Sequence, residues 1–283
     1  MPGSARSRDA RSALLAALLL AAAPAPAGAQ GRVEDGTGAA ERMVAEAFAR
    51  RYACAITGVV EISTSKGEMH ALKRRLHIAA KFLEGRLHTY AVFREPQYVR
   101  GMTFLGVESH DARGSEQQFV YLPSMKKIRR VSGSQPADSF LGTDLSYHDF
   151  QRQRPDRYRP LGLREATWAG ERVLRVRMEP RYDAPYSLVE YVIAASDRAI
   201  LATDYFKRSS EHAYKRMSMP RAHIVSGERC AVPTRIRVED DQRGTRTELV
   251  ISELRTDAAL DDSLFTTAAL ETRRDVPGIL DRR

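Results

Sequence analysis

The sequence predicts a mainly β protein, in which a long antiparallel sheet of about eleven or more strands follows one helix. Two observations lead to this class. Residues 69–82 and 86–94 alternate apolar and polar side chains with a period of two, which is typical of strands with one buried face. Short turn signals such as Glu84-Gly85 separate the segments, and strands joined by tight turns are nearly always antiparallel. A sheet of this size must curl, close or be covered.

The elements follow in order along the chain. Residues 39–52 have a helical period, with Val44 and Phe48 on one face, and Gly58 marks the change to period two. Residues 152–163 are polar and interrupted by proline, so they are expected to be irregular. Residues 262–265 form a short amphipathic piece before a polar tail. The expected strands are 59–64, 69–82, 86–94, 99–107, 118–122, 126–131, 165–168, 172–179, 187–194, 199–207, 212–218, 221–225, 232–239 and 245–254.

The N-terminus has the pattern of a cleaved export signal. Three arginines precede an apolar run at 14–23, two prolines interrupt it, and residues 27–29 read A-x-A. The run is too short to span a bilayer, which takes about 20 apolar residues. We therefore expect residues 1–29 to be removed. Residues 30–283 are then expected to form a single exported domain in the periplasm. The residue directly after the cleavage site is Gln30 and not a cysteine that could carry a lipid anchor.

Charge and cysteine content restrict the function classes. The formal net charge is +9, of which about +7 remains after residue 29. Such an excess suits an anionic membrane surface or nucleic acid, but export argues against nucleic acid. Because the arginines are spread along the chain, an ordinary solvated basic surface is the other interpretation. Cys54 and Cys230 are the two cysteines, and an oxidising compartment permits either a disulfide or two buried thiols.

The segment 129–150 contains serine, histidine and aspartate side chains and therefore has to be tested as an active site. Ser132, Ser134, Ser139 or Ser146 would be the nucleophile, His148 the base, and Asp144 or Asp149 the orienting acid. There is no G-x-S-x-G motif, and such residues are also common in loops and helix caps. The seven histidines are scattered without metal-ligand spacing, so neither a metal nor another cofactor is expected.

Phe140 and Leu141 are unusual because they are apolar residues within this Ser/Gly/Asp loop. Loops normally lie on the surface, so these two side chains either fit into a cavity as part of a lid or anchor the loop in an ordinary core. The sequence leaves both interpretations open.

Residues 121–150 resemble the periplasmic outer membrane lipoprotein-sorting protein family of the LolA-like superfamily. The resemblance rests on Tyr121-Leu122-Pro123, Arg129-Arg130, residues 139–144 (SFLGTD) and Tyr147-His148-Asp149. It implies an unclosed, strongly curved antiparallel β-barrel, with a helix and a loop as a lid over an apolar cavity. The loop residues that carry it include Arg129, Arg130, Ser139, Phe140, Gly142, Asp144, Tyr147 and Asp149.

The resemblance also implies a function without catalysis: carriage of a lipid or lipoprotein acyl chain across the periplasm. An inner-membrane RND-type transporter and an outer-membrane acceptor are the implied partners. The alternative is an RseB-like sensor or adaptor that binds a membrane protein. Polar strand faces such as Lys73-Arg75-His77 argue against an outer-membrane barrel, which needs apolar bands on nearly every strand. The expected cavity lining is Leu76, Ile78, Phe93, Met102, Phe104, Phe119, Phe140, Leu141, Trp168 and Tyr191.

Overall fold

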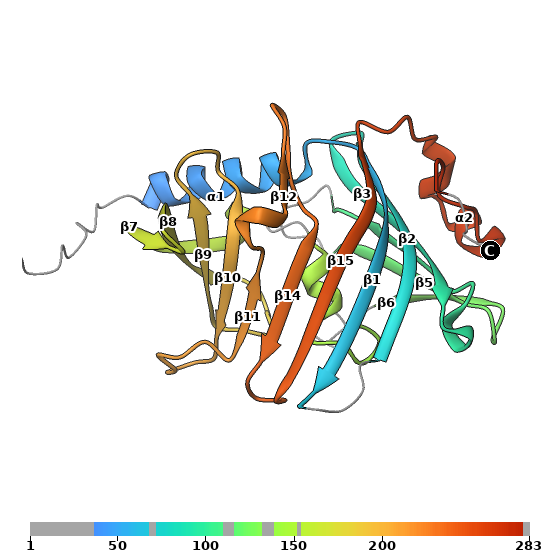
Figure 1. Ribbon diagram of the computed structural model, residues 1–283, viewed down its shortest axis with the longest axis horizontal. Helices are drawn as coiled ribbons and strands as arrows, with labels where there is room; N and C mark the ends of the chain where they lie inside the picture. The colour runs from blue at the N-terminus through green and yellow to red at the C-terminus, as the bar shows by residue number, and fades with distance from the viewer. Residues whose placement is uncertain (1–36, 68–71, 110–115, 132–138, 152–153, 280–283) are drawn as a thin grey trace, which may run out of the picture. The chain divides into compact units, whose positions relative to one another are not determined.

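The fold is built on one large antiparallel sheet. The computed structural model describes residues 37–67, 72–109, 116–131, 139–151 and 154–279. Within these ranges thirteen strands form a single sheet in the order β6-β5-β4-β3-β2-β1-β15-β14-β11-β10-β9-β8-β7, and β12 pairs separately with β13. Figure 1 shows the sheet curving from β7 on the left to β5 and β6 on the right. Since β6 and β7 are both edge strands, the barrel is unclosed.

The strands are β1 Ile56–Lys66, β2 Leu72–Leu83, β3 Arg86–Glu95, β4 Thr103–Val107, β5 Gln117–Leu122, β6 Lys127–Val131, β7 Tyr158–Trp168, β8 Glu171–Pro180, β9 Leu188–Ala194, β10 Ile200–Phe206, β11 Lys215–Ser218, β12 Ile224–Ser226, β13 Ala231–Pro233, β14 Arg235–Asp240 and β15 Thr245–Thr256. The α-helices are α1 Thr37–Tyr52 and α2 Thr267–Thr272. The 3-10 turns are η1 Gln97–Val99, η3 Phe140–Gly142, η4 Tyr147–Phe150, η5 Pro155–Arg157, η6 Arg221–His223 and η7 Asp262–Phe265.

The predicted fold class is confirmed, while several boundaries differ. Residues 158–163 belong to β7 and are not irregular. Pro160 is tolerated there because β7 pairs only with β8, so the missing N–H faces no second strand, and the register shifts between Pro160 and Gly162. The strand expected from residue 99 begins at Thr103, since Gln97–Val99 forms a 3-10 turn. The predicted export signal lies outside the described residues.

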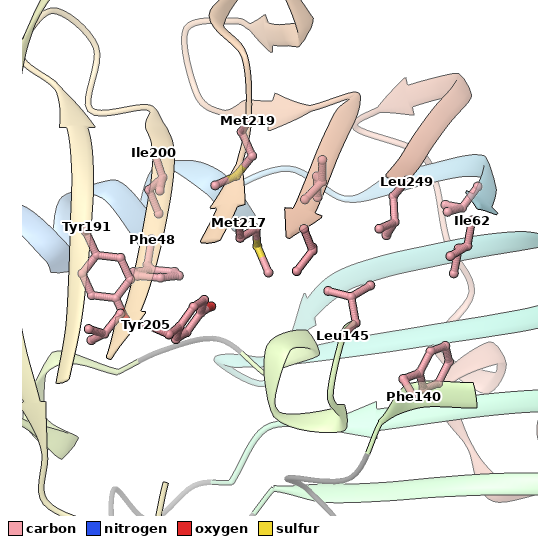
Figure 2. Packing of buried hydrophobic residues seen from close by; sticks show 14 of the residues in the cluster. Phe48, Ile62, Phe140, Leu145, Tyr191, Ile200, Tyr205, Met217, Met219 and Leu249 are labelled. Carbon is pink, nitrogen blue, oxygen red and sulfur yellow. The ribbon is translucent and has the colours of Figure 1, made fainter. Parts of the chain in front are cut away.

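The two faces of the sheet are covered by different elements. We call the face that packs against α1 and residues 139–150 the inner face, and the opposite one the outer face. On the inner face Phe48 of α1 lies edge-on to Tyr191 of β9, with 5.4 Å between ring centroids. Figure 2 shows both rings in this cluster, together with Met217 and Leu249.

The outer face carries two smaller apolar clusters. Leu264, Phe265 and Leu270, from η7 and α2, pack on Tyr90 and Leu105. The β12–β13 hairpin packs its Ala231 against a cluster from β8 to β10. The C-terminal part expected to be a polar tail therefore includes a helix, α2, that covers the outer face.

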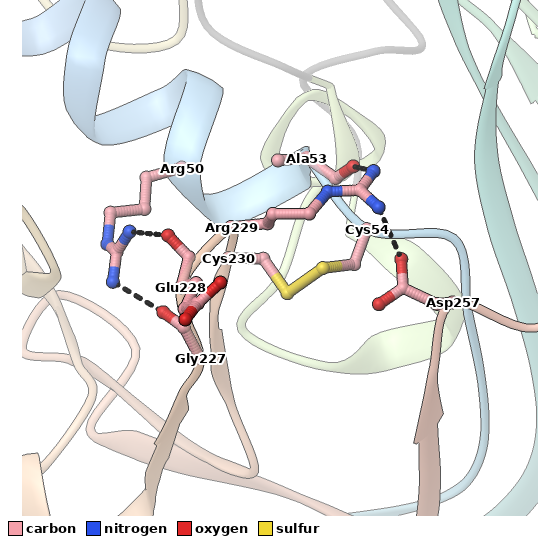
Figure 3. Close-up of a disulfide and its surroundings, with 8 residues drawn as sticks. All are labelled: Arg50, Ala53, Cys54, Gly227, Glu228, Arg229, Cys230 and Asp257. Atoms are coloured by element: carbon pink, nitrogen blue, oxygen red, sulfur yellow. Dashed lines mark hydrogen bonds and ion pairs between the residues drawn. A yellow bond between two sulfur atoms is a disulfide. The ribbon is translucent and has the colours of Figure 1, made fainter.

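A disulfide joins the end of α1 to this hairpin. Cys54 and Cys230 are bonded, with their Cα atoms 5.8 Å apart. Figure 3 shows the surrounding contacts: Arg50 donates to the carbonyl oxygens of Gly227 and Glu228, and Arg229 forms an ion pair with Asp257 at 3.2 Å. Of the two states that the sequence leaves open, the structure has the bonded one, and it fixes the helix that covers the inner face.

Candidate functional site

Residues 139–150, which we call the inner segment, lie against the inner face of the sheet. Phe140 is only 3% exposed. Its ring is surrounded by those of Phe93, Phe104, Tyr147 and Phe150, with centroid distances between 4.6 and 6.2 Å. Figure 2 shows Phe140 and Leu145 among the core side chains. Phe140 is therefore packed as a core anchor of the segment, which is the second of the two interpretations that the sequence left open.

Asp144 attaches the inner segment to β15. Its Oδ2 accepts a hydrogen bond of 2.8 Å from the Thr247 hydroxyl, which in turn accepts one of 2.9 Å from the Asp144 backbone N–H. Thr245 donates to the other carboxylate oxygen, and Arg243 donates to the carbonyl of Thr143 at 2.7 Å. These contacts satisfy a buried carboxylate, as buried polar groups require. Asp144 thus has a structural role.

Asp149 attaches the same segment to β11. Lys215 Nζ lies 2.6 Å from Asp149 Oδ2, which also accepts hydrogen bonds from the backbone N–H and the hydroxyl of Ser146. Burial alone would raise the pKa of the Asp149 carboxyl. The charge and hydrogen bond of Lys215 and the Ser146 N–H outweigh burial and hold this pKa below its usual value.

His148 makes a separate buried network. Its Nε2 lies 2.9 Å from the Tyr182 hydroxyl and 3.1 Å from the Tyr186 hydroxyl, and its Nδ1 lies 3.0 Å from Gln151 Oε1. Burial lowers the pKa of His148 to about 4, so the ring is neutral at pH 7. The Ser146 hydroxyl donates to Asp149 and not to His148, so these three residues do not have the geometry of a Ser-His-Asp triad. Ser132 and Ser134 lie outside the described residues.

Leu141 lies at the boundary between this core and an open pocket. It has a left-handed backbone conformation, with φ of 53°, and its carbonyl accepts a 2.5 Å hydrogen bond from Arg74 Nη2. Arg74 is buried on β2, and its Nε and Nη1 have no hydrogen-bond partner among the described residues. The contact fixes the start of the inner segment against the sheet.

The pocket, which we call the β4–β6 pocket, has a volume of about 360 Å³. Met102, Val120, Leu122, Val131, Leu141 and Tyr147 supply its apolar wall, and Arg129, Arg130 and Ser139 its polar part. The register explains the apolar wall, because Phe104 of β4 pairs with Val120 of β5, which pairs with Arg129 of β6. Directly paired residues share a face, so the inner-face row of the sheet ends at the edge strand in an arginine.

Arg129 and Arg130 are both exposed on this edge strand. No acidic side chain of the described residues lies within ion-pair distance of either guanidinium. Arg129 is on the inner face, whereas Arg130 pairs with Phe119 and is on the outer face. Both line the pocket. The pocket therefore combines an apolar interior with two cations that have no ion-pair partner in the part of the chain that the structure describes. This arrangement suits a ligand with an apolar chain and an anionic group.

The structure distributes the predicted lining residues over three environments. Met102 and Leu141 line the β4–β6 pocket. Leu76, Phe93, Phe104, Phe140 and Tyr191 belong to the packed inner-face cluster, and Ile78 packs against it. The prediction that Phe119 and Trp168 line the cavity is wrong. Phe119 packs under the α2 cluster and Trp168 beside the β12–β13 hairpin, both on the outer face.

Three lining residues escaped the sequence analysis: Val120, Leu122 and Val131. The alternation along β5 does carry the signal, since Val120 and Leu122 share one face while Phe119 and Tyr121 share the other. The aromatic side chains of Phe119 and Tyr121 made their face look like the cavity lining, although the pocket is lined by Val120 and Leu122. Of the family-motif residues, Arg129, Arg130, Ser139 and Tyr147 line the pocket, Gly142 has the positive φ of a turn, and Asp144 and Asp149 anchor the segment.

Two further cavities are larger, and most of the residues that line them are charged. One of about 580 Å³ lies between α1 and the β2–β3 turn, lined by Arg42, Arg86, Glu108, Arg154 and Asp156 among others. The other, of about 560 Å³, is lined by Glu61, Lys73, Arg75, Glu95 and Glu248 together with their neighbours. Neither has the apolar wall of the β4–β6 pocket. The described residues contain no group of His, Cys, Asp and Glu arranged to hold a metal ion. None of their helices has the length and hydropathy of a membrane span.

Comparison with solved structures identifies the fold. A domain named for outer membrane lipoprotein sorting, from Vibrio parahaemolyticus, is 19% identical with a TM-score of 0.76, over 83% of this chain and 99% of that one. A DUF1329 family protein from Desulfovibrio piger is 24% identical with a TM-score of 0.76, over 84% and 100% of the two chains. A LolA superfamily protein from Nitrosomonas europaea is 20% identical with a TM-score of 0.63, over 81% and 98%. The half-barrel is therefore LolA-like.

The sequence itself matches one family model. This model, described as "Uncharacterized protein", covers residues 85–272. The chain belongs to this family. The expectation of a LolA-like fold is confirmed by the solved structures. None of the curated proteins matches the sequence significantly.

Proposed function

We propose that the protein is a non-catalytic periplasmic carrier that binds an acyl chain of a lipid or lipoprotein in the β4–β6 pocket. The observation that carries the proposal is the combination of an apolar wall with Arg129 and Arg130 in one pocket of a LolA-like half-barrel. The Ser146 hydroxyl donates to Asp149 while the His148 ring contacts Tyr186, so His148 is not placed to activate Ser146 as a nucleophile, which supports a binding role for the pocket.

The size and chemistry of the pocket fit a single acyl chain. Ligand pockets typically measure about 300–1,000 Å³, and this one has about 360 Å³. Each buried CH₂ contributes about 0.8 kcal/mol, so even part of a fatty chain supplies useful affinity. Guanidinium groups bind phosphate and carboxylate oxygens in bidentate geometry. Arg129 and Arg130 would therefore hold the anionic end of the bound molecule.

The carrier role includes a donor and an acceptor. An RND-type transporter in the inner membrane and an acceptor at the outer membrane are the partners we propose, and the apolar run and A-x-A pattern at residues 14–29 support export to the space between them. The inner segment stays in place in this scheme, because its buried anchors at Asp144 and Asp149 hold it to the sheet. Exchange of the ligand then takes place at the open edge beside β6.

The test is the lipid content and acyl-probe affinity of the purified mature protein. We expect organic extracts to contain lipid by mass spectrometry, and the delipidated protein to bind a fluorescent fatty-acyl probe saturably. Leu141→Asn should weaken probe binding about tenfold, because it removes apolar wall while asparagine tolerates the left-handed backbone.

The matched control is Leu161→Asn, which makes the same change at an exposed leucine on β7. This variant should bind the probe like the wild type. A protein that is lipid-free and rejects acyl probes would refute the carrier role. If it instead captures one membrane protein in a stoichiometric complex, the adaptor function applies.

A further inference from the structure

We propose that the end of the sheet formed by the β3–β4 and β5–β6 turns is a docking surface for an anionic lipid bilayer. Two of the exposed large apolar side chains among the described residues lie there: Tyr98 is 69% exposed and Met125 is 44% exposed. We call this surface the basic end, because it also carries Arg100, Lys126, Lys127, Arg129 and Arg130. The surface does not depend on whether the β4–β6 pocket binds an acyl chain.

The two turns are neighbours in space. Thr103, just after the first turn, pairs with Tyr121, just before the second. A Cβ built on Gly101 would lie 3.6 Å from Cγ of Pro123, so the backbones of the two turns approach closely. The two turns that carry Tyr98 and Met125 therefore lie at the same end of the sheet, next to the β5–β6 edge. An aromatic and a methionine side chain held on adjacent turns form a pair suited to shallow insertion among lipid headgroups.

The charge of the basic end is of one sign. Residues 96–107 and 117–131, which form the two turns and their strands, contain five basic residues and no aspartate or glutamate. All five basic residues are exposed, and none forms an ion pair with another described residue. Elsewhere on the sheet arginines are commonly paired, as Arg237 is with Glu248 at 3.4 Å and Arg246 with Glu239 at 2.7 Å. The basic end departs from this pattern.

The nearest acidic residues do not cancel this charge. Glu95 precedes the first turn and lies 4.0 Å from Arg75, and Asp275 forms an ion pair with Arg94. Arg273 at the end of α2 adds a further cation beside the first turn. Its Cδ lies 3.1 Å from the position that a Cβ atom on Gly101 would occupy. The local field is therefore positive, and anionic leaflets attract such clusters within a Debye length. Exposed apolar tips with unpaired cations match the surface of a bilayer better than that of an acidic protein.

Docking of the basic end on a bilayer would place the β4–β6 pocket next to the lipid. Met102 follows the first turn and Leu122 precedes the second, and both line the β4–β6 pocket together with Arg129 and Arg130. A bilayer in contact with Tyr98 and Met125 would lie next to the rim of that pocket. The basic end therefore has the position required for ligand exchange with a membrane.

The experiment measures binding of the purified mature protein to vesicles by co-sedimentation. Vesicles of phosphatidylcholine with phosphatidylglycerol should bind the protein, pure phosphatidylcholine vesicles should bind it at least tenfold less, and raised salt should weaken binding. Lys126→Glu with Lys127→Glu, and separately Tyr98→Ser with Met125→Ser, should each weaken partitioning about tenfold or more. Circular dichroism and thermal melting check that the variants fold.

Matched controls make the same changes on other parts of the surface. Arg181→Glu with Arg208→Glu reverses two exposed arginines, and Leu161→Ser with Val225→Ser removes two exposed apolar side chains. Both controls should bind vesicles within twofold of the wild type. Equal losses in controls and basic-end variants, or no binding of the wild type to anionic vesicles at low salt, would overturn the proposal. So would binding only after a protein is added to the vesicles.

Acyl-probe affinity separates this proposal from the proposed function. The Lys126→Glu, Lys127→Glu variant should keep the fatty-acyl affinity of the wild type, while Leu141→Asn should show the weakened acyl-probe binding described above and keep vesicle binding. Failure of vesicle binding alone refutes the docking surface, and failure of acyl binding alone refutes the carrier role.

Discussion

Lys215 and Asp149 form an ion pair in which both side chains are almost completely buried. Nζ and Oδ2 are 2.6 Å apart, and the side chains are 7% and 1% exposed. The lysine belongs to β11 and the aspartate to the inner segment, so the pair connects the sheet to the chain that fills its inner face. The motif that resembled an active site is, in this part, an anchor.

Removing one partner of this pair should be costly. We expect Lys215→Met to lower the free energy of unfolding by about 3–5 kcal/mol, because it leaves a buried carboxylate without its counter-charge. Urea denaturation at pH 7 measures the change. Arg246→Met is the matched control, since its ion pair with Glu239 is largely exposed, and it should cost about 1 kcal/mol or less. Equal costs for the two variants would contradict the structural role of the buried pair.

The free energy of unfolding should fall as the pH is lowered below about 6.5, before most carboxylates become protonated. The pKa of His148 is about 4 in the folded protein because burial disfavours the imidazolium, against an ordinary value of 6.5. The unfolded chain therefore takes up a proton first. The contribution of His148 is complete above pH 6.5 and is lost as the pH falls towards 4, which amounts to about 3 kcal/mol.

Urea denaturation between pH 7.5 and pH 4.5 tests this dependence. His148→Gln should flatten the curve in this interval, whereas His212→Gln, a change at an exposed histidine, should leave it as in the wild type. A wild-type stability that does not change between these pH values would contradict the buried neutral imidazole.

Adjacent residues of the inner segment should separate stability from binding. Phe140→Ala removes a ring packed among four other aromatic rings and should cost about 3–5 kcal/mol. Leu141→Asn should cost much less and should mainly lower acyl-probe affinity. Thermal melting and probe titration on both variants check this pair. A stable Phe140→Ala protein with weakened binding would restore the interpretation of Phe140 as part of a lid.

The disulfide should contribute strongly to stability. Cys54 and Cys230 are separated by 176 residues along the chain, and cross-links that close long loops restrict the unfolded state most. We expect Cys54→Ser with Cys230→Ser to lower the free energy of unfolding by about 2–5 kcal/mol. Denaturation of the wild type with and without reductant provides a second measurement. Identical curves in all three cases would contradict this role.

The sequence predicted the sheet well wherever period two was uninterrupted. β2 and β3 follow from alternation, and α1 follows from its helical period. β7 was only partly predicted, because Pro160 and Gly162 are signals of irregular chain and only the edge position makes them acceptable. α2 was missed because a helix of this length has too few residues to show a period.

The candidate site was harder to predict, because alternation defines two faces without saying what covers each one. Phe119 and Trp168 have the size and hydropathy expected of cavity lining, but α2 and the β12–β13 hairpin bury the outer face as effectively as α1 buries the inner one. The sequence also cannot say whether the polar residues Asp144, His148 and Asp149 act in catalysis or as structural anchors. Their partners, Thr247, Lys215 and Tyr186, lie far away in the sequence, so only the fold shows that these residues act as anchors.

Photo-crosslinking with a fatty acid that carries a diazirine on its chain tests the account most directly. After irradiation and proteolysis, mass spectrometry locates the labelled peptides. We predict saturable labelling in segments 102–122 and 131–147, which contain Met102, Val120, Leu122, Val131 and Leu141, with competition by unlabelled lipid and a loss in Leu141→Asn. Labelling that does not saturate, or that falls on the polar cavity between α1 and the β2–β3 turn, would contradict a lipid site in the β4–β6 pocket.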